Sequence, residues 1–422
     1  MAPPASAAVL PALPPRTRAA AGLGGAVAAL SRRLGRGNGS VIGGRAILAV
    51  DPQALCRLAR GRDIALVSGT NGKTTTTSLL RAALATSGPV VTNVLGANLP
   101  PGIAAALAHG SGVPTAALEV DEAWLERVVD ASDPRVAVLL NLSRDQLDRN
   151  NEVRRLSSAW RSAVSGRPRL HVVANADDPL VVWAAAEAGS ITWVGAGQPW
   201  TADAAGCPSC GGRICFLDSG WACSGCEFRR PDLDVSLDDG VVVLAATGAR
   251  LVLHLRLPGR ANRANAALAM AAAERFGVDA ATALTAMADT HEVAGRYRSV
   301  RVGSTCARLL LAKNPAGWLE VFDMLAAPPT PVVVAINARI ADGKDPSWLW
   351  DVPFERLAGR LVVATGERSR DLAVRLHYAE VEHRHEPDAV AAIGLAGASE
   401  VDVVANYTAF QQISARVARD GG

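Results

Sequence analysis

Aromatic residues are scarce in this chain of 422 residues, and long uncharged apolar runs are missing from it. Only 4% of the residues are Phe, Trp or Tyr, and no basic tract carries interleaved aromatic residues. This composition argues against a nucleic-acid-binding protein. The apolar segment at 19–30 falls short of the roughly 18 uncharged residues that a membrane-spanning helix needs. The sequence therefore predicts no transmembrane helix.

A strong charge bias is also absent, because 43 basic and 40 acidic side chains give a net charge of +3. That balance neither favours nor excludes an anionic partner. The chain is 49% apolar and long enough for about two or three domains with a sizeable core. A signal peptide is the alternative interpretation of residues 1–30, but prolines interrupt it and no cleavage site precedes Ser31-Arg32-Arg33. We therefore expect a cytoplasmic protein.

A glycine-rich loop is the most informative feature that the sequence does contain. The apolar run 64–67 predicts a buried strand, and 75–84 predicts a helix with an apolar face. Backbone N–H groups at such a helix start, together with one lysine, bind the phosphates of ATP. The Thr74 hydroxyl follows Lys73, where it can ligate the accompanying Mg²⁺. The candidate ATP-binding residues are Gly69, Thr70, Asn71, Gly72, Lys73, Thr74 and Thr75.

The loop departs from the GxxxxGK[ST] pattern, because Val67 stands where the first glycine would be. An ordinary glycine turn between a strand and a helix is the alternative interpretation. Gly-Lys-Thr directly after a strand favours phosphate binding over that alternative.

Four of the seven cysteines form two CxxC pairs with 12 residues between them. This spacing is typical of a zinc ribbon, in which each pair supplies two thiolates to a tetrahedral Zn²⁺. Two disulfides or free thiols are the alternative. Four ligands leave no open position, so the predicted zinc site is structural. The ligands are Cys207, Cys210, Cys223 and Cys226, while Cys215 is spare and Cys56 and Cys306 are expected to be lone core residues.

Strand and helix patterns alternate from Arg62 onward, which predicts an α/β fold with a parallel sheet covered on both faces. A second alternating unit begins near residue 296. We expect a Pro/Ala-rich disordered extension at 1–30 and a small N-terminal cap at 31–61. A central ATP-binding domain at 62–295, interrupted by the ribbon at 205–230, and a smaller C-terminal domain at 296–422 follow.

Several further motifs occur in the order in which the Mur ligases and folylpolyglutamate synthases carry them, and the chain resembles that family. Gln146 and Ala261 stand where the family pattern has histidine. The matching segments are 69–75, 117–123, 141–149, 259–267, Gly295-Arg296 and 313–315. The resemblance implies a P-loop central domain, a Rossmann-like C-terminal domain, and Glu119 as a Mg²⁺ ligand. It also implies that Asn262 and Asn265 lie near the nucleotide and that Arg296 reaches phosphate.

Within this family the chain is most similar to the MurT branch, which carries a four-cysteine ribbon inserted in the ATPase domain. Segments 31–39 and 341–351 also match that branch. The resemblance implies ATP-dependent amidation of the D-Glu α-carboxylate in the lipid II stem peptide, through an acyl phosphate, giving D-isoglutamine. It places the protein in peptidoglycan synthesis, at or near the inner face of the cell membrane.

The resemblance also implies a heterodimer with a GatD-type class I glutamine amidotransferase that supplies ammonia. In agreement with this, Cys56 and Cys306 lack the Gly-x-Cys-x-Gly elbow of a glutaminase nucleophile. Asp351, with Asp345 as the second choice, is expected to complete the partner's Cys–His pair, with Trp348 and Trp350 anchoring the contact.

Two other classes of function remain open at this stage. One is a stand-alone ligase that joins an amino acid to a carboxylate, and the other is an ATP-binding scaffold without catalysis. The acids of the 341–351 segment also have a simpler interpretation as solvated loop residues.

Overall fold

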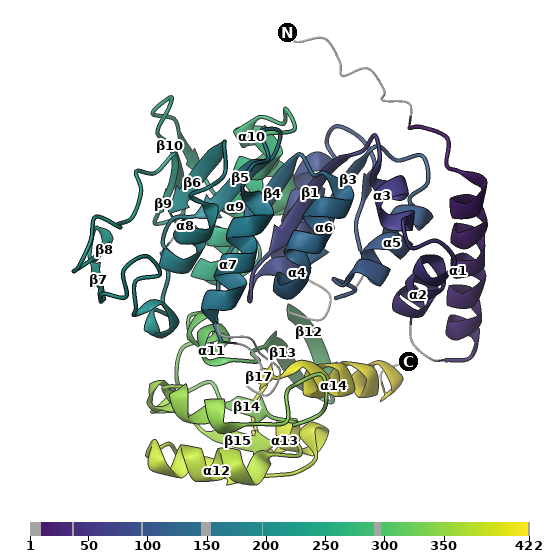
Figure 1. The fold of residues 1–422 in the computed structure, drawn as a ribbon. Coiled ribbons are helices and arrows are strands. Elements are labelled where there is room, and N and C mark those ends of the chain that lie inside the picture. Colours follow the sequence, from purple (N-terminus) through teal and green to yellow (C-terminus); the bar gives the residue numbers. More distant parts are fainter. Residues whose placement is uncertain are drawn as a thin grey trace. The chain divides into compact units, whose positions relative to one another are not determined.

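The computed structural model describes residues 10–35, 38–93, 96–144, 153–195, 197–290 and 297–420 (Figure 1). The chain divides into two compact units. The first unit comprises 1–142, 153–256 and 262–290, and the second comprises 143–152, 257–261 and 291–422.

Among the described residues, nine strands of the first unit form one sheet in the order β11-β10-β9-β6-β5-β4-β1-β3-β2. The strands from β2 to β9 pair in parallel, whereas β9, β10 and β11 pair antiparallel at one edge. Their bounds are β1 Asp63–Ser68, β2 Val90–Val91, β3 Thr115–Val120, β4 Val136–Leu139, β5 His171–Asn175, β6 Ile191–Gly195, β9 Val235–Asp238, β10 Val241–Leu244 and β11 Arg250–Val252.

In the parallel part of this sheet both faces are buried, which explains why β1, β3, β4 and β5 read as nearly continuous apolar runs. Side chains alternate along β1, so Ile64 and Leu66 join the core of one face, while Ala65 and Val67 are equally buried on the other. Helices α6, α7 and α8 pack side by side on one face (Figure 1). The helices are α4 Lys73–Leu84, α6 Leu125–Ser132, α7 Val153–Val164, α8 Pro179–Ala185, α9 Arg260–Glu274 and α10 Ala280–Ala288.

Four further helices of the first unit pack together near the β2 edge of the sheet: α1 Pro15–Arg33, α2 Ser40–Val50, α3 Ala54–Ala59 and α5 Pro100–His109. The prediction of a disordered extension at 1–30 is wrong from Pro15 onward, because α1 begins there. The prolines precede the helix or occupy its first position, where no backbone N–H is required.

Glycines allow α1 and α2 to pack closely. A Cβ on Gly24 would lie 2.8 Å from the Gly43 carbonyl oxygen, and one on Gly43 would lie 2.7 Å from the Gly24 oxygen. The Thr17 hydroxyl donates a hydrogen bond of 2.6 Å to Asp51 beyond the end of α2. These contacts order a segment whose composition alone predicts disorder.

The second unit contains a sheet of six strands among its described residues, in the order β12-β13-β17-β14-β15-β16. Only β12 runs antiparallel to its neighbour. Val332 and Val334 of β14 face one core, and Val333 and Ala335 face the other, so this sheet also is covered on both sides. The strands are β12 Tyr297–Val302, β13 Thr305–Leu311, β14 Val332–Ala335, β15 Val362–Thr365, β16 His383–His385 and β17 Glu400–Ala405.

Four α-helices and two 3₁₀ turns cover the sheet of the second unit in its described part: α11 Pro315–Phe322, α12 Ser369–Tyr378, α13 Ala389–Leu395, α14 Tyr407–Asp420, η3 Ser347–Asp351 and η4 Phe354–Leu357. The predicted α/β class, with a larger and a smaller parallel unit, is confirmed. Over the described ranges, no helix combines the length and apolarity that spanning a membrane requires.

Candidate functional site

The glycine-rich loop lies where the carboxyl ends of three neighbouring strands meet. The loop follows β1. Glu119 belongs to β3 on one side of β1, and Asn141 follows β4 on the other side. Open α/β sheets bind their ligands in this position, at the carboxyl ends of the strands and at the point where the strand order reverses. Helix α4 begins at Lys73, so the N–H groups of its first turn, which have no intrahelical acceptor, point toward the same place.

Gly72 is required at the turn into α4 for two physical reasons. Its φ of 84° lies in the left-handed region that only glycine adopts without strain. A Cβ on Gly72 would also lie 2.7 Å from Oδ1 of Asn265, a buried residue of α9. Asn262, one turn earlier on α9, is buried as well and shares that helical face. The structure therefore brings the Asn265 amide, which belongs to a predicted site residue, against the loop.

The Lys73 ammonium is almost fully buried inside the loop. It donates to the Gly69 carbonyl and forms an ion pair of 2.9 Å with Glu122, at the start of the 3₁₀ turn η1 (Glu122–Trp124). Burial disfavours the charged ammonium, but the Glu122 and Glu119 carboxylates outweigh this effect and raise the pKa of Lys73. The lysine therefore stays protonated at neutral pH, as a phosphate-binding cation must.

Two oxygens that suit Mg²⁺ lie next to each other at the start of α4. The Thr74 hydroxyl donates a hydrogen bond of 2.8 Å to Oε2 of Glu119. The Glu119 carboxylate is buried, and Asn98 donates to its other oxygen over 3.2 Å. A hydroxyl and a carboxylate are ligands that Mg²⁺ accepts alongside water and phosphate oxygens. The donor set therefore fits the predicted ion.

Three asparagines that were not predicted as site residues hold these groups in place. Asn141 clamps the loop, because its side chain accepts from the Asn71 N–H at 2.9 Å and donates to the Asn71 carbonyl at 3.1 Å. Asn93 exchanges two hydrogen bonds of 2.8 Å with the Glu119 backbone. Asn141 begins a segment that matches a family motif, so a signal was available for it, whereas Asn93 and Asn98 stand in no recognised pattern.

Glu122 is the other residue that sequence reasoning did not select. It follows Glu119 by three positions, after the end of β3, and it supplies the carboxylate nearest to Lys73. The predicted Arg296 and the motif residues 145–149 lie outside the described residues.

Asp351 ends the 3₁₀ turn η3 of the second unit and is well exposed. Arg144 approaches it at 3.9 Å, a distance at which an exposed ion pair contributes little. Next to it, the Trp350 side chain is 55% exposed and packs edge-on against Tyr378 of α12, with ring centroids 5.5 Å apart. Trp348 is instead buried in the core of the unit, so the prediction that both indoles anchor a contact is wrong for Trp348.

The neighbouring acids have structural roles. Asp345 accepts a hydrogen bond of 2.8 Å from the Ser347 backbone N–H, and this bond lowers the pKa of its carboxyl group. Asp342 is buried and accepts from the Thr408 N–H at 2.8 Å, so the interpretation of Asp342 as a solvated acid is wrong. Asp342 and Asp345 thus each accept a backbone hydrogen bond, whereas the contact described for Asp351 is the weak approach of Arg144.

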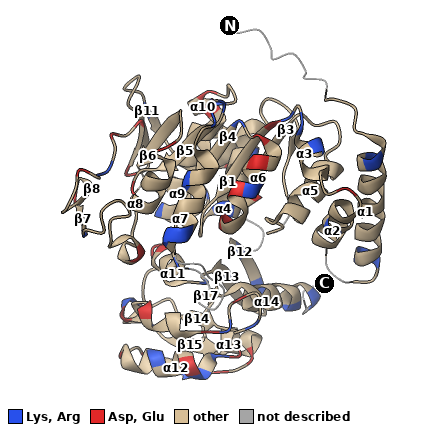
Figure 2. Cartoon of the chain, in the orientation of Figure 1, with Lys and Arg blue, Asp and Glu red and all other residues tan. Residues whose placement is uncertain are grey.

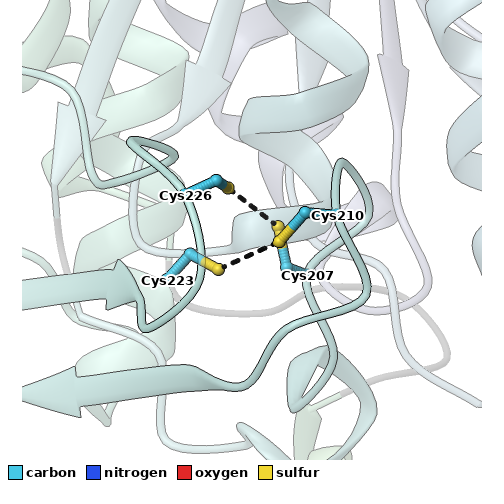
Figure 3. Close-up of side chains that lie close together, drawn as sticks. All are labelled: Cys207, Cys210, Cys223 and Cys226. Carbon is cyan, nitrogen blue, oxygen red and sulfur yellow. Dashed lines mark hydrogen bonds between the residues drawn. The ribbon is translucent and has the colours of Figure 1, made fainter.

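The four predicted cysteines converge in the described part of the first unit (Figure 3). All four sulfurs lie within 4.8 Å of one another. The Sγ–Sγ distance is 3.7 Å for Cys207 and Cys226 and 3.5 Å for Cys210 and Cys223. Tetrahedral Zn²⁺ with bonds of about 2.3 Å places its sulfur ligands about 3.8 Å apart. The geometry fits zinc and contradicts the disulfide alternative, because every cysteine is free.

Backbone N–H groups in the two CxxC turns support the thiolate form that binds zinc. Gly212 donates to Cys210 and Gly225 donates to Cys223, each over 3.3 Å. The Gly225 N–H lowers the pKa of Cys223 to about 7. At Cys226 the Phe228 N–H also lowers the pKa, but the neighbouring thiols and burial outweigh it and raise the pKa to about 12. A Cβ on Gly212 would lie 3.2 Å from both the Cys210 and Cys223 sulfurs, so a side chain there would crowd the cluster.

The ribbon is joined to the first unit by a small apolar contact. Its hairpin consists of β7 (Ile214–Leu217) and β8 (Gly220–Cys223). Trp221 is buried with Val182 of α8, and its indole donates a hydrogen bond of 3.0 Å to the Ala176 carbonyl. Cys56 and Cys306, expected in the core, are exposed and half-buried respectively, so that prediction is wrong.

We expect the Cys207→Ser/Cys226→Ser variant to lose its zinc, because each CxxC pair would then keep only one thiolate. Zinc content should fall from about one ion per chain to nearly none, and the melting temperature should drop by about 5 °C or more. Metal analysis and calorimetry measure the two effects. The control is Cys215→Ser, which removes a thiol from the same hairpin without touching the cluster. Full metal content in the double variant would contradict the zinc assignment.

Comparison with known proteins agrees with this arrangement. The model of the Mur ligase middle domain matches residues 67–205, and the model described as MurT ligase C-terminal matches residues 311–410. The MurT subunit of lipid II isoglutaminyl synthase (glutamine-hydrolyzing) from Streptococcus pneumoniae is 33% identical, covering 82% of this chain and 83% of that protein. The same subunit from Staphylococcus aureus is 30% identical, covering 83% and 85%.

Solved structures support the fold. A pseudomurein peptide ligase type C from Methanothermus fervidus superimposes with a TM-score of 0.65 at 17% identity, covering 83% of this chain and 77% of that one. MurF from Acinetobacter baumannii gives 0.63 at 16% identity, covering 88% and 80%. The extent of the sequence similarity, and the match of both family models in the expected order, show that the chain is a ligase subunit and belongs to the MurT family of the Mur ligases.

Proposed function

We propose that this chain is the synthetase subunit of a glutamine-dependent ligase that amidates the D-Glu α-carboxylate of the lipid II stem peptide. The observation that carries the proposal is the arrangement of Lys73, Thr74 and Glu119 around one loop at the carboxyl end of β1. The name of the relatives, lipid II isoglutaminyl synthase, supports this substrate and product.

The reaction has two steps. A carboxylate oxygen attacks the γ-phosphorus of ATP, the bond to the β–γ bridging oxygen breaks, and ADP leaves. The resulting acyl phosphate has a good leaving group, which a free carboxylate lacks. Ammonia then attacks the acyl carbon, a C–N bond forms, and inorganic phosphate departs as nitrogen loses a proton to water. Positioning and neutralisation of charge are the main tasks of the protein in both steps.

The residues of the loop divide these tasks. Lys73 and the backbone N–H groups of residues 69–75 hold the phosphates, and Thr74 and Glu119 hold Mg²⁺, which neutralises charge on the nucleotide. Asn262 and Asn265 border the nucleotide, because Asn265 already lies against Gly72. We assign to Arg296, which lies outside the described residues, the stabilisation of the transferring phosphoryl group.

Ammonia comes from a partner in this proposal. We infer a heterodimer with a GatD-type class I glutamine amidotransferase, and we assign the acid that orients the partner's histidine to Asp351. The exposed Trp350 and Tyr378 beside Asp351 suit such a contact, since aromatic side chains are enriched at interfaces. The zinc site is structural and stabilises the central domain.

We propose three divisions of the chain: a cap that begins with α1 at Pro15 and ends at residue 61, an ATP-binding domain at 62–295 carrying the ribbon, and a partner-binding domain at 296–422. ATP, glutamine and the stem peptide are all available on the cytoplasmic side of the membrane. We therefore place the protein in the cytoplasm, at the inner membrane face.

Reconstitution tests the proposal. The chain and its glutaminase partner, with ATP, glutamine and lipid II, should form amidated product, ADP and phosphate in equal amounts. The chain without its partner should be inactive with glutamine and active with a high concentration of ammonium chloride. Ligation of an amino acid by the chain without its partner would favour a stand-alone ligase. ATP binding without ADP release by the full complex would indicate a scaffold.

A further inference from the structure

Charge is distributed unevenly along the chain. The first 50 residues contain six arginines and no Asp, Glu, Lys or His. The net charge of the whole chain is only +3, so the remaining residues are acidic overall. The described arginines of this segment all lie on or beside α1 and α2 and are exposed: Arg16, Arg18, Arg32, Arg33 and Arg45.

These five guanidinium groups are not neutralised by carboxylates. Within the described ranges, none of them forms an ion pair with Asp or Glu, whereas fifteen other arginines do. Figure 2 shows blue on α1 and no red there. The α1–α2 surface therefore presents positive charge that is available to an external anion.

Apolar side chains are exposed on the same two helices. Leu23 and Leu30 of α1 and Leu34, the residue that follows it, are between 48% and 60% exposed, and the spacing of seven residues places Leu23 and Leu30 on one side of the helix. Ile42 of α2 is 51% exposed. The residues buried against the rest of the unit, among them Thr17, Ala20 and Gly24, lie about a quarter of a turn around α1 from the leucines. Exposed leucines on a folded helix, flanked by arginines, indicate a surface that contacts something else.

We propose that this α1–α2 surface docks the protein on an anionic lipid bilayer. The leucines would enter the boundary between headgroups and acyl chains, and the arginines would pair with lipid phosphates around them. Charge decides between this occupant and a second copy of the chain, because two copies would bring together arginines that have no carboxylate partner. The assignment deepens the proposed function, on which its biological meaning rests, by naming the surface that meets the membrane carrying the substrate.

Vesicle co-sedimentation tests the surface. The full-length chain, at low salt and without nucleotide, should bind vesicles of phosphatidylglycerol and phosphatidylcholine and should bind vesicles of pure phosphatidylcholine far more weakly. Arg18→Gln/Arg33→Gln should weaken binding to the anionic vesicles about 30-fold, since each basic residue contributes about 1 kcal/mol. Leu23→Glu/Leu30→Glu should weaken it at least as much, because it removes apolar contact and adds negative charge.

Matched control variants change the same residue types elsewhere. Arg155→Gln/Arg370→Gln and Leu217→Glu/Leu395→Glu alter exposed residues outside α1 and α2 and should bind vesicles like the unchanged chain. All four variants should keep the unchanged melting temperature, and with the partner they should amidate a water-soluble stem-peptide analogue at the unchanged rate. This second readout separates failure of the membrane inference from failure of the proposed function.

Three results would overturn the membrane inference. The first is absence of binding to anionic vesicles by the unchanged chain at low salt. The second is equal loss of binding in the control variants and the α1 variants. The third is a dimer in solution that Leu23→Glu/Leu30→Glu converts to monomer, which would assign the surface to a second copy of the chain.

Discussion

Replacement of Lys73 by alanine is expected to abolish ATP-dependent amidation, with a loss of about a thousandfold or more in rate. The ammonium is the cation held inside the phosphate-binding loop, and its removal leaves the phosphate charge without a direct counter-charge. The measurement is ADP release by the complete complex with ammonium chloride as nitrogen source, so that the result does not depend on the partner's glutaminase.

Lys73→Ala also leaves two carboxylates without their cation. Glu122 and Glu119 both stabilise the ammonium in a buried position, so the single variant should be less stable. The double variant Lys73→Ala/Glu122→Gln removes one of those charges and should recover stability without recovering amidation. Arg81→Ala, which removes an exposed cation from the same helix, is the control and should keep full activity.

Amidation at nearly the normal rate by Lys73→Ala would remove the loop from the ATP site. Recovery of amidation by the double variant would show that the lysine acts only on stability. Glutamine hydrolysis by the partner should persist in both variants, because its nucleophile belongs to another chain.

The second large effect is expected for Asp351→Asn, which should lower glutamine hydrolysis by the complex about a hundredfold or more. An acid that orients a catalytic histidine fixes its tautomer and stabilises its charged form, and an amide does neither. Asparagine keeps the shape of the exposed aspartate, and the 3.9 Å approach of Arg144 contributes little to folding, so a loss of hydrolysis reports on the carboxylate itself. Complex formation should be retained.

Asp345→Asn is the matched control, because it removes a carboxylate six positions earlier whose oxygen accepts from the Ser347 N–H. It should cost some local stability and leave hydrolysis nearly unchanged. Trp350→Ala should weaken assembly, since it removes an exposed ring that packs on Tyr378. Unchanged hydrolysis by Asp351→Asn, or loss that disappears at saturating partner concentration, would remove Asp351 from the catalytic set.

Features that depend on neighbours along the chain were predictable. The segment from Gly69 to Thr74 follows a strand directly and runs into a helix, so six residues suffice to indicate the loop. The same holds for the two CxxC turns, in which each cysteine pair is brought together by its own turn. Their meeting was predictable only because the ribbon is a known pattern, and the structure places all four sulfurs within 4.8 Å.

Other contacts join residues far apart in sequence and could not be read from it. The Lys73–Glu122 pair spans 49 positions, and the Asn141 clamp on Asn71 spans 70. Both exist because β3 and β4 flank β1 in the sheet, and strand order depends on how the crossovers pack. The burial of Trp348 and the exposure of Trp350 were likewise decided by the core of the second unit, since both have the same local sequence context.

The N-terminal segment shows most clearly where prediction from the sequence alone fails. Its composition, rich in proline, alanine and glycine, predicts disorder when each residue is considered by itself. In the folded chain the same glycines let α1 and α2 approach within contact of their backbones, which orders residues 15–33 as a helix.

The sequence by itself thus determined the α/β class, the phosphate-binding loop and the cysteine ribbon, because each is encoded in a short, contiguous or regularly spaced pattern. Only the tertiary structure decided which carboxylate neutralises Lys73, which tryptophan is exposed beside Asp351, and which helix carries leucines and arginines without carboxylate partners at the surface. Those outcomes depend on the packing of elements distant in sequence, and packing is a property of the whole fold.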